Sequence, residues 1–221
     1  MTVPRIALIL VLGISTGCLD SSLGEVKSTN VPANQLTIEP TIVDSDAAPA
    51  DGMIPVVVQF FQGNEYVRLS TASLSVNGVT VPFGSMGYLA KIPLVPSGGT
   101  IAFTHIQAGV TTQLTYRVPP RPTITSPATN EVVPRMTNLM IAYVSADGQA
   151  VRPVAADASL GTSGIEQSDN GMAFLDVTGL RPGAGSVGVA RRYVTSPSGS
   201  GFQSVAVTYT ITSLPVPVTW Q

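Results

Sequence analysis

The 221-residue chain has few of the side chains that most often carry chemistry in proteins. It has one cysteine, Cys18, one histidine, His105, and one tryptophan, Trp220. Only two residues are lysine, and charged residues make up 11% of the chain. A single thiol excludes an internal disulfide framework, and one thiol with one imidazole argues against a zinc site. Because no basic stripe is available to neutralise phosphates, we expect no nucleic-acid partner.

The chain also lacks amphipathic helical periodicity. Outside the first residues, no long window places apolar residues at a spacing of 3.6. Instead, short runs rich in Val, Ile, Thr, Tyr and Phe recur between Gly, Pro, Asn and Asp, for example "IPVVVQFF", "NLMIAYV" and "SVAVTYTI". The dipeptide Asn77-Gly78 lies between alternating apolar residues, which is a strong hairpin signal. This pattern predicts an all-β sandwich.

The N-terminus has the pattern of a secretory signal. Arg5 precedes an apolar run over residues 6–14. This run is too short for a membrane-spanning helix, which needs roughly 20 residues. Small residues then lead to Cys18, so residues 1–17 are predicted to be a cleaved signal peptide. An ordinary signal peptide cleaved nearby is the alternative, with Cys18 lost or left as a free thiol.

The stretch "STGC", which ends at Cys18, resembles the lipobox of bacterial lipoproteins. The resemblance implies that the Cys18 sulfur carries a diacylglycerol and that this residue becomes the mature N-terminus. The protein would then be exported and anchored to the cell membrane or outer membrane by an N-terminal lipid. Residues 18–34 contain few large apolar residues, which predicts a flexible tether.

Two segments in different halves of the chain are similar to each other. "LVPSGGTIAF" starts at Leu94 and "LRPGAGSVGV" at Leu180. A repeated turn-and-strand signature indicates two copies of one plan. A leucine and proline before a glycine-rich turn and a strand resemble the link between strands E and F of fibronectin type III and related immunoglobulin-like domains. The resemblance implies two tandem immunoglobulin-like β-sandwich domains.

The stretch "VPPRPTITSPA" marks the predicted boundary, because prolines stop a sheet ladder. We therefore predict a first sandwich over residues 35–118, a proline-rich linker over 119–122 and a second sandwich over 121–218. Alternation predicts which residues share the core face of each domain. In the first domain these are Val56, Val58, Phe60, Leu74 and Val76. In the second they are Leu139, Ile141, Tyr143, Phe174, Val177, Val205, Val207 and Tyr209.

Candidate catalytic motifs are weak. His105 is expected near the end of a strand, where a surface histidine is the ordinary case. "GAGSVG" at residues 183–188 matches a dinucleotide-binding pattern, but a proline precedes it and a strand follows, so we interpret it as a turn. We expect no enzymatic activity and no cofactor, and a hydrolase is the least favoured function.

One acidic loop is a weak calcium candidate. "DSDAAPADG" places Asp44, Asp46 and Asp51 close together, and carboxylate oxygens are the ligands that Ca²⁺ prefers. The spacing differs from that of an EF-hand, and a solvated loop is the simpler interpretation.

Aromatic residues give a second candidate site. Phe61, Tyr66 and Tyr88 could stack on a sugar ring if they lie on an exposed sheet face. Core packing is the alternative. Similar alternatives apply to Trp220, which either packs on its own domain or anchors a partner. Of Arg191 and Arg192, which face opposite ways, one should be exposed and the other near an edge or an acidic partner.

Three functions remain, in order of preference. The first is an envelope lipoprotein that binds or scaffolds a surface or envelope protein through loops or exposed strand edges. The second is a carbohydrate-binding or adhesion lipoprotein, with a glycan as ligand of the aromatic residues. The third is a hydrolase.

Overall fold

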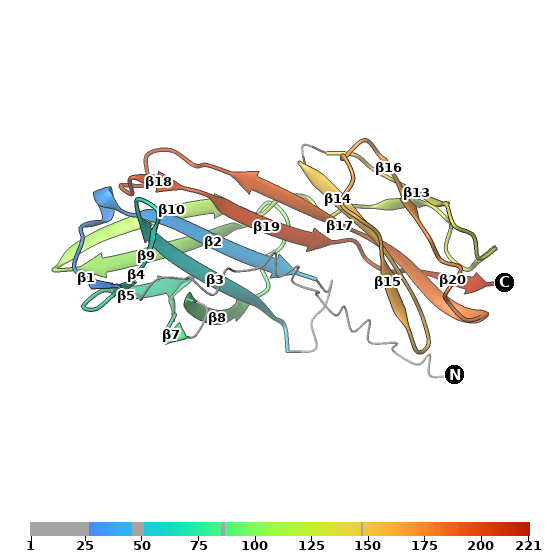
Figure 1. Ribbon diagram of the computed structural model, residues 1–221, viewed down its shortest axis with the longest axis horizontal. Helices are drawn as coiled ribbons and strands as arrows, with labels where there is room; N and C mark the ends of the chain where they lie inside the picture. The colour runs from blue at the N-terminus through green and yellow to red at the C-terminus, as the bar shows by residue number, and fades with distance from the viewer. Residues whose placement is uncertain (1–26, 46–50, 85–86, 147) are drawn as a thin grey trace.

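The computed structural model describes residues 27–45, 51–84, 87–146 and 148–221. These residues form β-strands, turns and one 3₁₀-helix, η1 (Ala33–Gln35), and none of them is in an α-helix. The strands build two sandwich-like halves, one after the other along an elongated molecule (Figure 1). The predicted all-β sandwich class is confirmed.

A sheet of thirteen strands runs through both halves. Its continuous path is β1-β4-β3-β2-β19-β17-β14-β15, and five further strands pair at its margins. The strands are β1 (Lys27–Thr29), β2 (Thr37–Asp44), β3 (Met53–Gln62), β4 (Glu65–Leu69), β7 (Phe83–Gly84), β8 (Gly87–Pro93), β12 (Glu131–Val133), β14 (Ala150–Asp157), β15 (Gly161–Ser163), β17 (Gly183–Thr195), β18 (Ser204–Val205), β19 (Val207–Thr212) and β20 (Val216–Trp220).

Two smaller sheets complete the sandwiches, one in each half. The first half has a four-stranded sheet in the order β10-β9-β5-β6, and the second a three-stranded sheet in the order β11-β13-β16. Their strands are β5 (Ser73–Val76), β6 (Val79–Thr80), β9 (Thr100–Gln107), β10 (Val110–Arg117), β11 (Ile124–Ser126), β13 (Leu139–Tyr143) and β16 (Met172–Leu175). Asn77 and Gly78 join β5 to β6 with positive φ angles of 49° and 79°, so the predicted hairpin is confirmed.

The first core lies between the four-stranded sheet and one end of the large sheet. It contains the five side chains predicted from alternation in the first half, all of them buried: Val56, Val58, Phe60, Leu74 and Val76. It also contains residues from β19, and the ring of Tyr209 stacks on that of Tyr116 with centroids 5.6 Å apart. The far end of the chain therefore completes the core of the first half.

The second core contains four of the predicted residues, Leu139, Ile141, Tyr143 and Val177. The prediction for three others is wrong, because they are buried in the first core instead: Val205, Val207 and Tyr209. The prediction for Phe174 is wrong, because its side chain is 47% exposed. Its neighbours Ala173 and Leu175 are buried instead. Alternation shows which residues share a face of a strand, but the wrong face was assigned to the core here.

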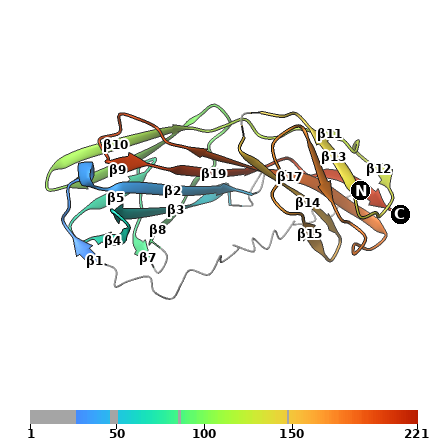
Figure 2. The ribbon, with the colours of Figure 1, turned by 45° about the horizontal axis from the view of Figure 1, so that its top comes forward.

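Strand β17 connects the two cores. Val187 and Val189 lie in the second core, whereas Tyr193 lies in the first. β19 then pairs in parallel with β2, with Tyr209 opposite Ile42, before β20 returns to pair with β17. Figure 2 shows β17 passing from one half into the other. Residues 193–212, inside the predicted range 121–218, thus pack mostly with the first half.

The C-terminal tryptophan packs on its own half. Trp220 is buried, and its indole Nε1 donates a hydrogen bond of 2.9 Å to the carbonyl oxygen of Ala156. β20 lies beside the start of β17, where Gly185 pairs with Val218. A Cβ at position 185 would overlap both Trp220 Nε1 and the Ala156 oxygen. The residues of "GAGSVG" form the start of β17, so their interpretation as a turn is wrong, and Gly185 leaves room for the indole.

We predict that Gly185→Ala lowers the free energy of unfolding by about 2–4 kcal/mol, from overpacking and from the lost indole hydrogen bond. Gly179→Ala is the matched control, because a Cβ at position 179 meets nothing within 4 Å. Urea unfolding followed by tryptophan fluorescence measures both variants. Equal stability of the two would contradict this account of Trp220.

Candidate functional site

An aromatic row crosses the margin of the large sheet in the first half. β3 and β4 form a hairpin whose turn contains Gly63, at a positive φ of 61°. The hairpin register places Phe61 opposite Tyr66, and their ring centroids are 5.7 Å apart. Cross-strand aromatic pairs of this kind stabilise a hairpin. Both side chains are half-buried, so part of each ring faces solvent.

The row continues through β7 and β8. Phe83 stacks on Tyr66 with centroids 6.5 Å apart and meets Tyr88 edge-on at 5.2 Å. Tyr88 is buried, and its hydroxyl accepts a hydrogen bond from Leu69 N (3.0 Å) and lies 3.2 Å from Leu69 O. The three predicted binding residues, Phe61, Tyr66 and Tyr88, thus lie in one row. Tyr88 is buried and contacts Phe83 edge-on. Phe83 is half-buried, so Phe83 rather than Tyr88 is partly exposed to solvent.

The positively charged side chain of Arg68 lies over one ring of this row, that of Phe83. The guanidinium carbon of Arg68 is 4.8 Å from the centroid of the Phe83 ring, within cation–π distance. Burial raises the pKa of both Tyr66 and Tyr88, so both phenols stay protonated at neutral pH. The row therefore combines three half-buried aromatic rings, Phe61, Tyr66 and Phe83, with one exposed cation, Arg68. Sequence reasoning missed Phe83 and Arg68, because nothing local shows that the short β7 folds back against β4.

The row requires a glycine at position 87. A Cβ there would lie 2.9 Å from the carbonyl oxygen of Val58 and 3.1 Å from the hydroxyl of Tyr66. Gly87 also has a φ of 122°, which L side chains rarely adopt. This glycine allows β8 to approach β3 closely enough for the rings to meet.

The acidic calcium candidates have other partners in the structure. Asp44 is buried at the end of β2 and pairs with Arg121, with Oδ2 2.6 Å from the guanidinium nitrogen. Asp51 pairs with Lys91 at 2.8 Å, and this hydrogen bond lowers the pKa of the Asp51 carboxyl. Asp46 lies outside the described residues. Within the described ranges, no three His, Cys, Asp or Glu side chains are grouped so that they could hold a metal.

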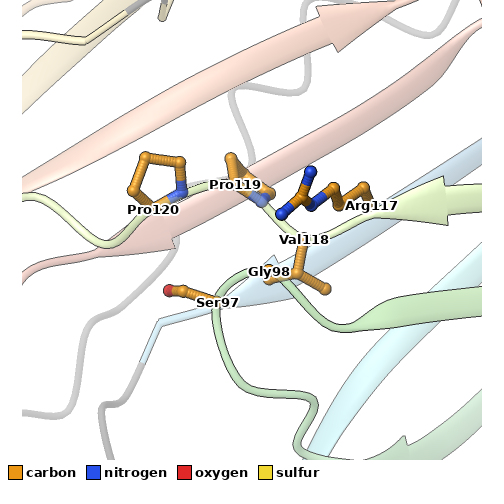
Figure 3. Close-up of a pocket in the computed structure, with 6 residues that line it drawn as sticks. All are labelled: Ser97, Gly98, Arg117, Val118, Pro119 and Pro120. Carbon is orange, nitrogen blue, oxygen red and sulfur yellow. The ribbon is translucent and has the colours of Figure 1, made fainter.

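Arg121 connects the linker to two strands that are distant in the sequence, β2 and β19. Besides the ion pair with Asp44, its guanidinium donates a hydrogen bond to the carbonyl oxygen of Thr212 on β19. An open hollow of about 490 Å³ lies next to this junction (Figure 3). Its lining residues come from the β8–β9 loop and from the end of β10 with the prolines that follow: Ser97, Gly98, Arg117, Val118, Pro119 and Pro120.

A second buried ion pair lies where β17 enters the first half. Arg191 Nε is 2.6 Å from Asp169 Oδ2, and both side chains are almost fully buried. The guanidinium also donates to the carbonyl oxygen of Val144 at 2.6 Å. Arg192 is partly exposed and pairs with Glu166 at 3.0 Å. The prediction of one exposed arginine and one arginine beside an acidic partner is confirmed.

His105 is a core residue, so its predicted place on the surface is wrong. The imidazole is 1% exposed and lies between the rings of Phe60 and Phe202, each with its centroid 5.7 Å away. Neither ring nitrogen has a hydrogen-bond partner among the described residues. Burial lowers the pKa of His105, which keeps the ring neutral. A general base needs a substrate proton within reach, and a ring enclosed by two phenyl groups offers no such path.

Cys18, the predicted lipidation site, lies outside the described residues. In the part of the chain that is described, no helix is long and apolar enough to cross a membrane.

Comparison with known proteins gives only distant structural likeness. No protein-family model matches the chain, and no curated protein does. Fibronectin(III)-like modules of CbhA from Clostridium thermocellum match over 89% of this chain and 90% of theirs, with 13% identity and a TM-score of 0.28. The I-band fragment I67–I69 of titin matches over 86% of this chain and 65% of the fragment, with 7% identity and a TM-score of 0.22.

Because His105 is the only histidine in the sequence and is buried, its titration alone should make the free energy of unfolding depend on pH near neutrality. Since the folded pKa of His105 lies below the ordinary value of 6.5, acid protonates the unfolded chain first. Stability should therefore fall as the pH drops below about 6.5, by at most about 1.4 kcal/mol per pH unit, until the folded pKa is reached. Urea midpoints measured between pH 7.5 and 5.5 test this. His105→Leu should remove the histidine contribution, and a wild-type midpoint that is flat over this range would contradict it.

Proposed function

We propose that the protein is a lipid-anchored module of the cell envelope that binds or scaffolds another envelope protein and has no catalytic role. The observation that carries the proposal is the sheet shared by the two halves. Because β17 runs through both halves, with β19 and β20 following in opposite halves, the halves are joined by hydrogen-bonded strands as well as by the proline linker. Such a body suits a spacer or scaffold, which must hold two surfaces at a fixed separation.

The charged side chains at the junction support a structural role. Asp44, Arg121, Asp169 and Arg191 are engaged in two close ion pairs, and three of the four are almost fully buried. These groups link strands and segments that are distant in sequence.

The N-terminal sequence supports the envelope location. The signal-like residues 1–17 and Cys18 fit export followed by acylation, and two or more acyl chains hold a protein durably on a membrane. Residues 18–26, the part of the predicted tether 18–34 that precedes β1, would then carry the folded halves away from the lipid, since residues 27–29 pair with β4. The partner protein would bind to loops or to exposed strand edges of the two halves.

We predict that the mature N-terminal peptide begins at Cys18 and carries acyl mass. Mass spectrometry of protein extracted from the membrane fraction measures both the start and the added mass. Cys18→Ser should abolish the added mass and change the fractionation, whereas the described fold starts at residue 27 and should be unaffected. An unmodified N-terminus, or cleavage elsewhere, would contradict the anchor. Cross-linking in cells, followed by identification of a defined envelope protein, tests the binding role separately.

Glycan binding is the second candidate function, and the aromatic row favours it. Half-buried Phe61, Tyr66 and Phe83 contact one another in sequence, and Arg68 lies over the Phe83 ring. Rings in this arrangement can stack on the apolar face of a pyranose, and the cation can contact an acidic sugar.

If the row binds a glycan, Phe61→Ala should weaken binding about 10-fold, because one ring face of the platform is lost. Phe174→Ala is the matched control, since Phe174 is an exposed aromatic residue in the other half of the molecule. A glycan array followed by titration calorimetry on the best ligand makes the comparison. Equal losses in both variants, or no binding by the wild type, would contradict this second function.

A further inference from the structure

One long strand in the described structure is paired along one side only. β10 has eight residues and lies at the end of the four-stranded sheet, where β9 is its single partner. Each of the other described strands with a single partner has only two to four residues: β1, β6, β7, β11, β12, β15, β16 and β18. Short edges offer little backbone to a partner, whereas β10 offers a full row of backbone groups.

Other edges of the molecule are protected by the devices that natural sheets use. The side-chain amide of Gln167 occupies the edge of β16, where it donates to Phe174 O at 2.7 Å and accepts from Phe174 N at 3.0 Å. The partly open side of β8 carries Lys91 and Pro93. β10 has the sequence "VTTQLTYR", without proline or lysine, and its one charge is at the end, on Arg117. This edge therefore lacks the features that oppose strand pairing.

The hydrogen-bonding pattern shows which backbone groups face outward. Ala108 and Gly109 form a two-residue turn with positive φ angles of 49° and 79°, which makes Gln107 and Val110 a hydrogen-bonded pair. At the other end, the N–H of Val118 donates to Gly99 O, and its carbonyl accepts from Gly98 N. Even-numbered residues of β10 thus face β9. By alternation, the N–H and C=O groups of the four odd-numbered residues point away from the sheet: Thr111, Gln113, Thr115 and Arg117.

We propose that this edge pairs with the same edge of a second copy of the chain, antiparallel and around a two-fold axis at Leu114. In this register Thr111 lies opposite Arg117 of the second copy, and Gln113 lies opposite Thr115 of the second copy. All four outward residues find partners, and the two four-stranded sheets become one continuous sheet. A shift along the edge in either direction leaves some of these groups unpaired.

Side chains favour this self-pairing over a random extended partner. The register keeps the two Arg117 side chains apart, each opposite a threonine, so no like charges face each other. Val110, which is 66% exposed at the end of the strand, lies opposite Val118 of the second copy, whose own side chain is buried in the core of its half. The edge is therefore complementary to itself in backbone hydrogen bonding and in charge, as a two-fold interface requires. The inference goes beyond the proposed function and does not depend on the lipid anchor.

Sedimentation velocity on the chain from residue 19 onward tests the proposal, because that chain keeps every described strand and both cores. We expect a reversible dimer. Thr115→Pro should weaken the dimer about 10- to 100-fold, since it removes one outward N–H from each copy and no bond to β9. Thr115→Val, which keeps the N–H, is the control and should dimerise like the wild type. A chain that stays monomeric at high concentration overturns the proposal.

Amide hydrogen exchange locates the contact and does not rely on a variant that folds. The amides of Thr111, Gln113, Thr115 and Arg117 should become protected as the concentration rises, while even-numbered amides of β10 are protected at every concentration. A dimer that leaves those four amides unprotected uses another surface and overturns the proposal.

Discussion

The structure depends on one strand that serves two cores. β17 has thirteen residues, and its inward side chains change from the second core to the first along its length. At the crossing the chain buries Arg191, whose charge is balanced by the equally buried Asp169. Removing one partner of such a buried pair costs about 3–5 kcal/mol, because an uncompensated charge remains in the interior. The join between the halves is thus a specific electrostatic arrangement within continuous strands.

The second ion pair of the junction has a different place in the molecule. Asp44 ends β2, Arg121 belongs to the proline-rich linker, and the guanidinium also reaches the last carbonyl of β19. One side chain therefore links β2, the linker in the middle of the chain and β19. Prolines stiffen the linker locally, and Arg121 fixes where it lies. The shared sheet and this contact together constrain how far the halves can bend against each other.

Local sequence signals predicted local structure well. The Asn77-Gly78 turn and the buried faces of β3 and β5 follow from alternation and turn chemistry. The segments that start at Leu94 and Leu180 lead into β9 and β17, as their similarity suggested. The parallel pairing of β2 with β19 joins residues more than 150 positions apart, and no local pattern encodes it. Contacts between residues distant in sequence were also the reason that the sequence did not predict Phe83 as part of the aromatic row. For the same reason it did not predict the ion pairs of Asp44 with Arg121 and of Asp51 with Lys91.

The position of β19 also sets an order of assembly. The first half cannot close its core until Val207, Tyr209 and Ile211, near the end of the chain, are in place beside β2. A nascent or partly translocated chain therefore exposes one side of β2 and the apolar side chains beneath it. If the chain is exported, this first half must complete its folding on the far side of the membrane, after residues up to 211 have passed through. Until β19 is in place, the exposed apolar side chains of the first half must be kept from binding to other copies of the chain.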